Sequence, residues 1–186
     1  DLSPGMLAAA AAKGGSAHLV GGDAEQLPLL SASCDLCFST LALQWCASLP
    51  QALAEIWRVV RPGGHLALAT LSDGSLMELR QAWRQVDALD HVNPFIPEQT
   101  LLELCQAQGF EILRWQRQQH VLHYPTLHEL LTSLKGIGAN QVTGHRSNGL
   151  VGRNRWMALQ QAYEYKRDDT GLLPISYEVC YGVLTR

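Results

Sequence analysis

The amino-acid sequence predicts an open α/β fold, and three observations lead to this prediction. Short apolar runs typical of buried β-strands alternate along the chain with segments whose apolar residues recur at helical spacing. Clusters of proline and glycine, such as residues 62–64, separate these segments by short loops. The 186 residues contain no repeat, low-complexity tract or linker, and 47% of them are hydrophobic. We therefore expect one domain that covers residues 1–186.

The N-terminal segment is predicted to begin with one helix and one strand. Ser3 and Pro4 are typical of a helix start, because a serine caps the first turn and proline fits its first position. The alanine-rich residues 6–12 continue the helix, and the glycine pair 14–15 ends it. Residues 17–20 then form a short predicted strand.

The remaining elements follow the same alternation. Residues 34–41 form a continuous apolar run, which is typical of a strand buried on both faces of a parallel sheet. Residues 49–60 place their apolar positions on one helical stripe, and the cluster 62–64 ends that helix. The later elements are predicted as strands at 65–71, 110–124 and 175–185 and helices at 76–88, 97–108, 127–135 and 153–165.

The charge pattern excludes some classes of protein. Fourteen Lys and Arg residues against seventeen Asp and Glu residues give a net charge of −3, so a generally basic nucleic-acid-binding protein is not expected. No apolar run approaches the ~18 residues that a membrane helix needs, so no membrane association is expected. Residues 112–155 differ from the rest, with six basic residues against one acidic residue. This segment is either a set of scattered solvated side chains or a patch for an anionic partner.

The cysteines indicate a reducing compartment. There are five of them, an odd number spread over apolar segments, and we expect no signal peptide. We expect free thiols and a cytoplasmic protein. Cys34 and Cys37 form a CxxC pair, but positions i and i+3 of a strand point to opposite faces. We therefore expect no metal site there.

Polar residues stand where the predicted strands end. Asp1 directly precedes the first helix, Asp23 follows the strand at 17–20, and Gln44 lies just beyond the strand at 34–41. Ligands of open α/β sheets bind outside the carboxyl ends of the strands. A carboxylate there can accept hydrogen bonds from both hydroxyls of a ribose or from an adenine amino group. Each signal alone also fits a helix-flanking acid or a turn, but their order and spacing together are more specific.

These residues belong to a longer pattern made of residues 1–7, 22–28, 34–39 and 55–64. The pattern resembles the class I S-adenosylmethionine-dependent methyltransferases. The resemblance implies a Rossmann-like open, mostly parallel sheet with helices on both faces and an antiparallel last strand. It also implies the cofactor S-adenosyl-L-methionine. The implied cofactor residues are Asp1 at the ribose, Met6 on the adenine, Asp23 and Ala24 at the adenine edge, and Leu2, Gly22, Ser39 and Leu41 around them.

A narrower resemblance covers nearly the whole chain. Residues 41–46, 74–79, 93–97 and above all 133–140 are similar to the malonyl-[acyl-carrier protein] O-methyltransferase family of biotin synthesis. The run at 133–140 (Ser-Leu-Lys-Gly-Ile-Gly-Ala-Asn) lies outside the shared cofactor part. This resemblance implies methyl transfer from S-adenosylmethionine to the free carboxylate of a malonyl thioester, giving the malonyl methyl ester that enters pimeloyl synthesis.

The implied reaction needs no catalytic base and no metal, because a carboxylate with an ordinary pKa near ~4 is already the ionised nucleophile at pH 7. We expect Gln44, Lys135 and Arg146 to bind the substrate. The implied partner is an acyl carrier protein, which is acidic, and the basic segment 112–155 is the expected docking surface.

The chain departs from the family pattern at one point. The glycine-rich loop that holds the methionine half of the cofactor is expected upstream of Asp1, together with the first strands of the sheet. Residues 1–72 are then the cofactor half, and residues 73–186 supply the substrate-side helices and the last two strands. Two alternatives stay open: a methyltransferase for a small molecule such as a quinone precursor, and an inactive fragment that lacks the glycine-rich loop.

Overall fold

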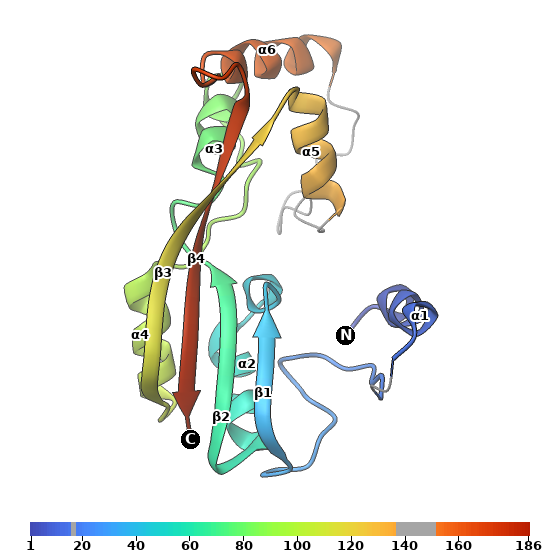
Figure 1. Ribbon diagram of the computed structural model, residues 1–186, viewed down its shortest axis with the longest axis vertical. Helices are drawn as coiled ribbons and strands as arrows, with labels where there is room; N and C mark the ends of the chain where they lie inside the picture. The colour runs from blue at the N-terminus through green and yellow to red at the C-terminus, as the bar shows by residue number, and fades with distance from the viewer. Residues whose placement is uncertain (16–17, 137–151) are drawn as a thin grey trace. The chain divides into compact units, whose positions relative to one another are not determined.

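A computed structural model describes residues 1–15, 18–136 and 152–186, apart from the side chains of residues 135 and 136 (Figure 1). The chain divides into two compact units, which are described separately below. Unit 1 contains residues 1–71, 96–117 and 180–186, and unit 2 contains residues 72–95 and 118–179. Strands β3 and β4 each have residues in both units.

Apart from the predicted strand at 17–20, the helices and strands follow the predicted order, with boundaries that shift by a few residues. Unit 1 holds α1 (Pro4–Lys13), β1 (Cys34–Thr40), a 3-10 turn η1 (Leu43–Trp45), α2 (Leu49–Val59), β2 (Val60–Leu71) and α4 (Glu98–Ala107). Unit 2 holds α3 (Met77–Arg84), α5 (Leu127–Gly136) and α6 (Arg153–Glu164). The two long strands are β3 (Glu111–Tyr124) and β4 (Leu173–Thr185).

The four strands form one open sheet in the order β1-β2-β4-β3. Strands β1 and β2 are parallel, and their paired residues run from Leu36 with His65 to Thr40 with Ala69. Strand β4 runs against β2, because the Gly63 N–H donates to the Arg186 carbonyl while the Arg186 N–H donates to the Gly64 carbonyl. Figure 1 shows β1, β2 and β3 pointing one way and β4 the other. The mostly parallel sheet with an antiparallel last strand is therefore confirmed.

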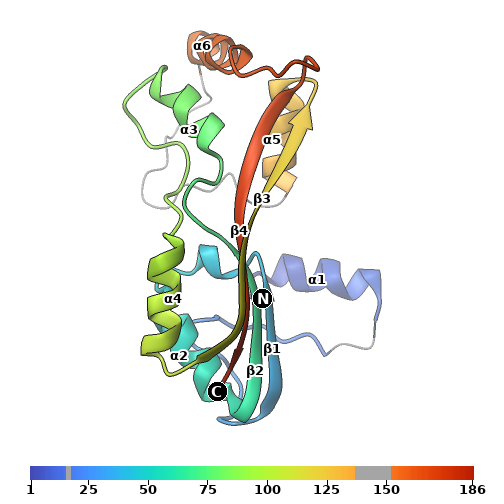
Figure 2. The same ribbon diagram turned by 60° about the vertical axis from the view of Figure 1, so that its left-hand side comes forward.

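The core of unit 1 lies between the sheet and two helices. Helix α2 begins where the Ser48 hydroxyl accepts the Gln51 N–H, and its apolar stripe buries Leu53 and Ile56 completely or nearly so. These side chains pack with Leu66 of β2 and Leu101 of α4 in one cluster. Figure 2 shows α2 and α4 on one side of the sheet and α1 on the other. Helix α1 has no buried residue, so the sheet face on its side is open.

The exposure of this face corrects one prediction. Residues 34–41 are not buried on both faces, because Phe38 of β1 is 70% exposed and Leu36 is 57% exposed. In the described part of the chain β1 is an edge strand, and no described helix packs its apolar residues onto that face. The predicted strand at 17–20 is also wrong, since residues 18–20 have no regular structure and residue 17 lies outside the described residues.

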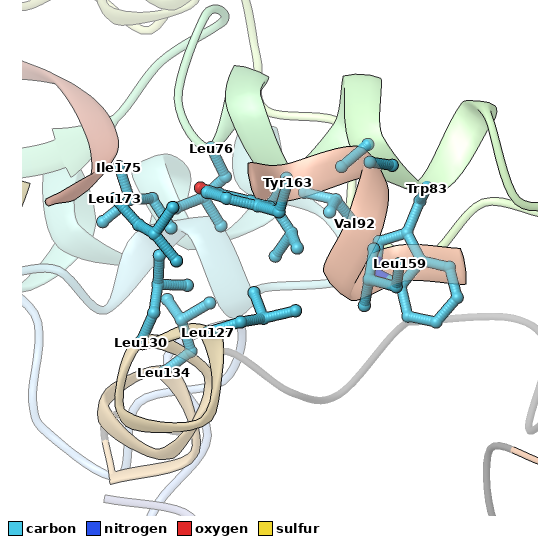
Figure 3. Packing of buried hydrophobic residues seen from close by; sticks show 13 residues of the cluster. Leu76, Trp83, Val92, Leu127, Leu130, Leu134, Leu159, Tyr163, Leu173 and Ile175 are labelled. Atoms are coloured by element: carbon cyan, nitrogen blue, oxygen red, sulfur yellow. The ribbon is translucent and has the colours of Figure 1, made fainter. Parts of the chain in front are cut away.

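The core of unit 2 is a separate cluster of leucine and aromatic side chains (Figure 3). Leu127, Leu130 and Leu134 lie one helical turn apart on α5 and point into it. Tyr163 of α6 is fully buried, and its hydroxyl donates to the Pro174 carbonyl at 2.9 Å. Burial raises the pKa of Tyr163, and the nearby Glu78 adds to the rise. The phenol is therefore a neutral donor at every physiological pH.

We predict that Tyr163→Phe lowers the free energy of unfolding by about 1 kcal/mol, because it removes one buried hydrogen bond. Leu130→Ala should cost more, about 2–5 kcal/mol, because it leaves a cavity in the same cluster. Urea denaturation measures both changes. Tyr165→Phe is the matched control, because Tyr165 lies at the end of the same helix and is 81% exposed. If the Tyr163 and Tyr165 variants lower the free energy of unfolding equally, the buried hydrogen bond of Tyr163 does not stabilise the fold as predicted.

Candidate cofactor site

The residues predicted to bind the adenosine half of the cofactor lie in unit 1. The Gly22 N–H donates to the Asp1 carbonyl at 3.1 Å, so the start of the chain and the segment around Asp23 lie side by side. A Cβ atom at Gly22 would come within 2.6 Å of the Pro28 ring, so only glycine fits there. The sequence separation of 21 residues gave no sign of this contact.

Both predicted carboxylates shape their own turns and keep one oxygen for a ligand. Asp1 Oδ1 accepts the Ser3 N–H at 2.8 Å, and Asp23 Oδ1 accepts the Glu25 N–H at 2.9 Å. Both residues are exposed, and within the described residues Oδ2 of each accepts no hydrogen bond. Each free oxygen can accept a hydroxyl or an amino group, the donors that ribose and adenine offer. Met6 of α1 is 59% exposed and Leu2 is 71% exposed, so both can contact an aromatic ring.

Glu25 fixes this segment in place, a role that the sequence did not indicate. Its Oε1 atom accepts the Ala47 N–H at 2.6 Å and the Ser48 N–H at 3.1 Å. These donors stand at the start of α2, where the backbone N–H groups have no partner within the helix. A carboxylate there also complements the positive end of the helix dipole. Glu25 therefore fastens the segment carrying Asp23 and Ala24 to the rigid start of α2.

Glu55 and Arg58 on α2 hydrogen-bond to the backbone of residues 27–29, which follow the segment carrying Asp23 and Ala24. Glu55 Oε2 accepts the Leu27 N–H at 2.8 Å, while Arg58 donates to the carbonyls of Leu27 and Leu29 at 2.9 and 2.8 Å. The two side chains also pair with each other, with Nε of Arg58 2.8 Å from Oε1 of Glu55. The Arg58 hydrogen bond lowers the pKa of Glu55. The sequence pattern contained both residues but assigned them no role.

The end of β1 is a strained turn that Gln44 supports. Leu41 has a positive φ of 49°, which is costly for a residue other than glycine, and its N–H donates to the Ala69 carbonyl at 2.7 Å. The Gln44 Nε2 atom donates to the Leu41 carbonyl at 2.8 Å, and the buried Thr70 hydroxyl donates to Gln44 Oε1 at 3.2 Å. Gln44 is thus oriented by its neighbours, and the second hydrogen on Nε2 remains for a ligand. Ser39 lies on β1 and is half-buried.

The side chains of the other two predicted substrate residues, Lys135 and Arg146, lie outside the described residues. Lys135 is on α5 in unit 2, and its side chain lies outside the described residues. Arg146 lies outside them altogether. The predicted site residues whose side chains the structure describes, including Gln44, all lie in unit 1.

The basic segment 112–155 is divided between the two units, and part of its charge is neutralised. In unit 1, Arg117 lies 3.7 Å from the Glu98 carboxylate. In unit 2, Arg155 pairs with Asp87. Burial opposes ionisation of Asp87, but hydrogen bonds from Arg155, the Leu89 N–H and His91 lower its pKa to about 2. Arg153, at the exposed start of α6, forms no ion pair with another described residue.

The described residues also bear on disulfide bonds, metal sites and membrane-spanning helices. All five cysteines lie in the described part of the chain, and none of them forms a disulfide bond there. Residues 1–15, 18–136 and 152–186 contain no group of three or more His, Cys, Asp and Glu side chains placed to hold a metal ion. In the same ranges no helix has the length and apolar character needed to cross a membrane.

We predict that Glu55→Gln lowers stability in a pH-dependent way. A carboxyl group whose pKa is lowered by folding stabilises the folded state above its unfolded pKa, near 4.5, and loses this contribution as the pH falls. The free energy of unfolding of the wild type should therefore exceed that of Glu55→Gln most clearly above that pH, and the gap should narrow on acidification. Denaturant titrations from pH 3 to pH 7 measure it. If the difference in the free energy of unfolding stays constant from pH 3 to pH 7, the ionised Glu55 does not stabilise the fold as predicted.

The chain is similar to named proteins over its whole length. A methyltransferase domain family matches residues 1–68. The malonyl-[acyl-carrier protein] O-methyltransferase of Serratia marcescens is 46% identical over 186 residues, which cover all of this chain and 71% of that protein. The protein of the same name from Pectobacterium atrosepticum is 42% identical, again with coverage of 100% and 71%. The biotin biosynthesis bifunctional protein BioHC of Cellvibrio japonicus is 41% identical and is covered to 37% of its length.

Solved structures agree on the fold. The YcgJ protein of Bacillus subtilis has a TM-score of 0.64 at 16% identity, with 99% of this chain and 78% of that chain covered. An S-adenosylmethionine-dependent methyltransferase of Mesorhizobium loti has a TM-score of 0.52 at 18% identity, with 100% and 78% covered. These likenesses confirm the class I methyltransferase fold. With the sequence identities above, they make this chain an S-adenosyl-L-methionine-dependent methyltransferase, and it belongs to the malonyl-[acyl-carrier protein] O-methyltransferase family.

Proposed function

We propose that this protein methylates the free carboxylate of a malonyl group carried by an acyl carrier protein, a step of biotin synthesis in the cytoplasm. One observation carries the proposal. The general methyltransferase family matches only residues 1–68, whereas the relatives of that name match all 186 residues. Their similarity therefore includes unit 2, beyond the part that methyltransferases of many substrates share.

For the cofactor, we propose that residues 1–72 hold S-adenosylmethionine, within a single domain of residues 1–186. Asp1 accepts the two ribose hydroxyls, and Asp23 with the Ala24 N–H reads the adenine edge. Leu2 and Met6 supply exposed apolar surface for the adenine ring. Gly22, Ser39 and Leu41 lie around the bound adenosine. The free Oδ2 atoms of Asp1 and Asp23 and the close packing at Gly22 support this assignment.

For the chemistry, the chain has only to position the reactants and remove water. S-adenosylmethionine, when bound, supplies an electrophilic methyl group. The malonyl carboxylate is ionised at pH 7 and attacks without a base, so no catalytic residue is assigned. The second N–H of Gln44 can orient the carboxylate without neutralising it, since Leu41 and Thr70 hold the amide in one orientation. Within residues 73–186, Lys135 and Arg146 are the proposed substrate cations.

For the partner, we propose that the segment 112–155 faces the acidic carrier protein. Arg153 is the best candidate for this contact, since it is exposed and pairs with no described carboxylate. The ion pairs at Arg117 and Arg155 favour a second candidate function, because a methyltransferase for a small molecule such as a quinone precursor needs no basic docking surface. The two candidates differ in their dependence on the carrier protein.

The cofactor assignment predicts that Asp1→Ala weakens binding of S-adenosylmethionine at least about tenfold. The variant loses two charge-assisted hydrogen bonds, each worth about 1.5–3 kcal/mol. Asp23→Ala should weaken binding less, because the Ala24 N–H still meets the adenine. Calorimetry on the protein that carries this chain measures both. Asp35→Ala is the control, since this exposed carboxylate on β1 pairs with Arg61. If Asp1→Ala binds S-adenosylmethionine as tightly as the wild type, the proposal that Asp1 binds the ribose is wrong.

The partner assignment predicts that the wild-type protein forms a methyl ester on malonyl-acyl-carrier protein, detected by mass spectrometry. Arg153→Glu should lower kcat/KM for this substrate, and the loss should shrink as salt rises, because an exposed charge mainly steers the encounter. Malonyl coenzyme A should be almost unaffected. Arg61→Glu, outside the segment, is the control. Equal losses on both thioesters would contradict carrier docking, and methylation of quinone precursors alone would favour the second candidate.

A further inference from the structure

Unit 2 contains a cavity of about 260 Å³ at the start of α3 that none of the functions above uses. Its wall combines charged and apolar groups. Arg80 and Arg84 supply two guanidinium groups, Asp73 supplies one carboxylate, and Phe95 and Met77 supply apolar surface. The charged side chains of the wall therefore sum to a positive charge.

The fold of α3 places both arginines on the cavity side. They are four residues apart, so they lie on the same face of the helix, while Leu79, Ala82 and Trp83 are buried on the other. The Arg80 guanidinium donates one hydrogen bond to the Asn93 carbonyl at 2.8 Å, which fixes its position. Neither Arg80 nor Arg84 forms an ion pair with any described residue. Their remaining N–H groups are thus available to an anion.

Two forked guanidinium groups are the side-chain arrangement best suited to the oxygens of a phosphate group. We propose that this cavity binds the phosphate of a phosphopantetheine arm, with the adjacent Met77 and Phe95 against the apolar part of the arm. This inference rests on the proposed function, in which the malonyl group is carried as a thioester. Carrier protein and coenzyme A both present such an arm, so both should use the cavity.

The exposure of the cavity favours the phosphate over the reacting carboxylate. Met77 is 47% exposed, and Arg84 is also exposed. A carboxylate that attacks a methyl group must lose water, and two guanidinium groups would reduce its nucleophilicity. A phosphate that does not react keeps part of its hydration and still gains from the positive charge. The cavity therefore suits the spectator end of the substrate.

A binding experiment tests the site without any need for catalysis. Calorimetry should show that the wild-type protein binds 4′-phosphopantetheine at least about tenfold more tightly than pantetheine, which lacks the phosphate. Arg80→Ala and Arg84→Ala should each reduce this preference, and Arg61→Ala, an exposed arginine of unit 1, should leave it intact. Because Arg80 also contacts Asn93, thermal melting checks its fold, and the exposed Arg84 gives an independent variant. No phosphate preference in the wild type would overturn the proposal.

Kinetics then separates this site from the proposed function. In the protein that carries this chain, Arg84→Ala should raise KM for malonyl coenzyme A and malonyl-carrier protein severalfold and leave malonyl pantetheine unchanged. If Arg84→Ala raises KM equally for malonyl coenzyme A and for malonyl pantetheine, which lacks the phosphate, the proposed phosphate site is wrong. A wild-type protein that methylates no malonyl thioester would instead overturn the proposed function, and the binding experiment would still decide whether the cavity holds phosphate.

Discussion

The ion pair between Glu55 and Arg58 is the interaction on which the proposed cofactor site depends. The loop from Leu27 to Ser33 has no regular structure, so its backbone groups need partners outside a helix or sheet. Glu55 and Arg58 provide several of them from the surface of α2, and they can do so together because each neutralises the other. This arrangement fixes the loop between the segment that carries Asp23, which precedes it, and strand β1, which follows it.

Helix α2 therefore has two functions in this fold. Its apolar stripe packs against β2 and α4, and its polar edge holds the loop that follows the proposed adenine-side residues Asp23 and Ala24. Glu25 adds a third contact at the start of the same helix. The candidate site is thus built on a rigid element, although Asp1, Asp23 and Ala24 lie outside the helices and strands, which is the usual division between scaffold and binding loop. The strained turn at Leu41 is supported in the same way, by Gln44 and the buried Thr70.

The two faces of the sheet in unit 1 differ sharply in environment. One face is covered by α2 and α4, whereas the other exposes Leu36 and Phe38 of β1 and forms an open groove of about 380 Å³ beside Thr40, Arg114 and Tyr181. Exposed aromatic and branched residues on a sheet are unusual in a folded chain, because their burial stabilises it by about 25 cal/mol per Å². The apolar sequence of β1 is therefore more typical of a strand that is covered on both faces than of the strand with one open face in the described residues.

The sequence by itself determined the kind and order of most elements, and it predicted which side chains bind the cofactor. Helical spacing in 49–60 and alternation in 175–185 depend only on local geometry, so these elements were predicted almost to the residue. Burial depends on what packs from elsewhere, so the exposure of Phe38 and the missing strand at 17–20 could not be read from local pattern. Only the tertiary structure assigned roles to Glu25, Glu55 and Arg58, because each meets backbone groups more than twenty residues away. A carboxylate or guanidinium in the sequence carries no mark of the distant N–H or carbonyl that it will satisfy once the chain is folded.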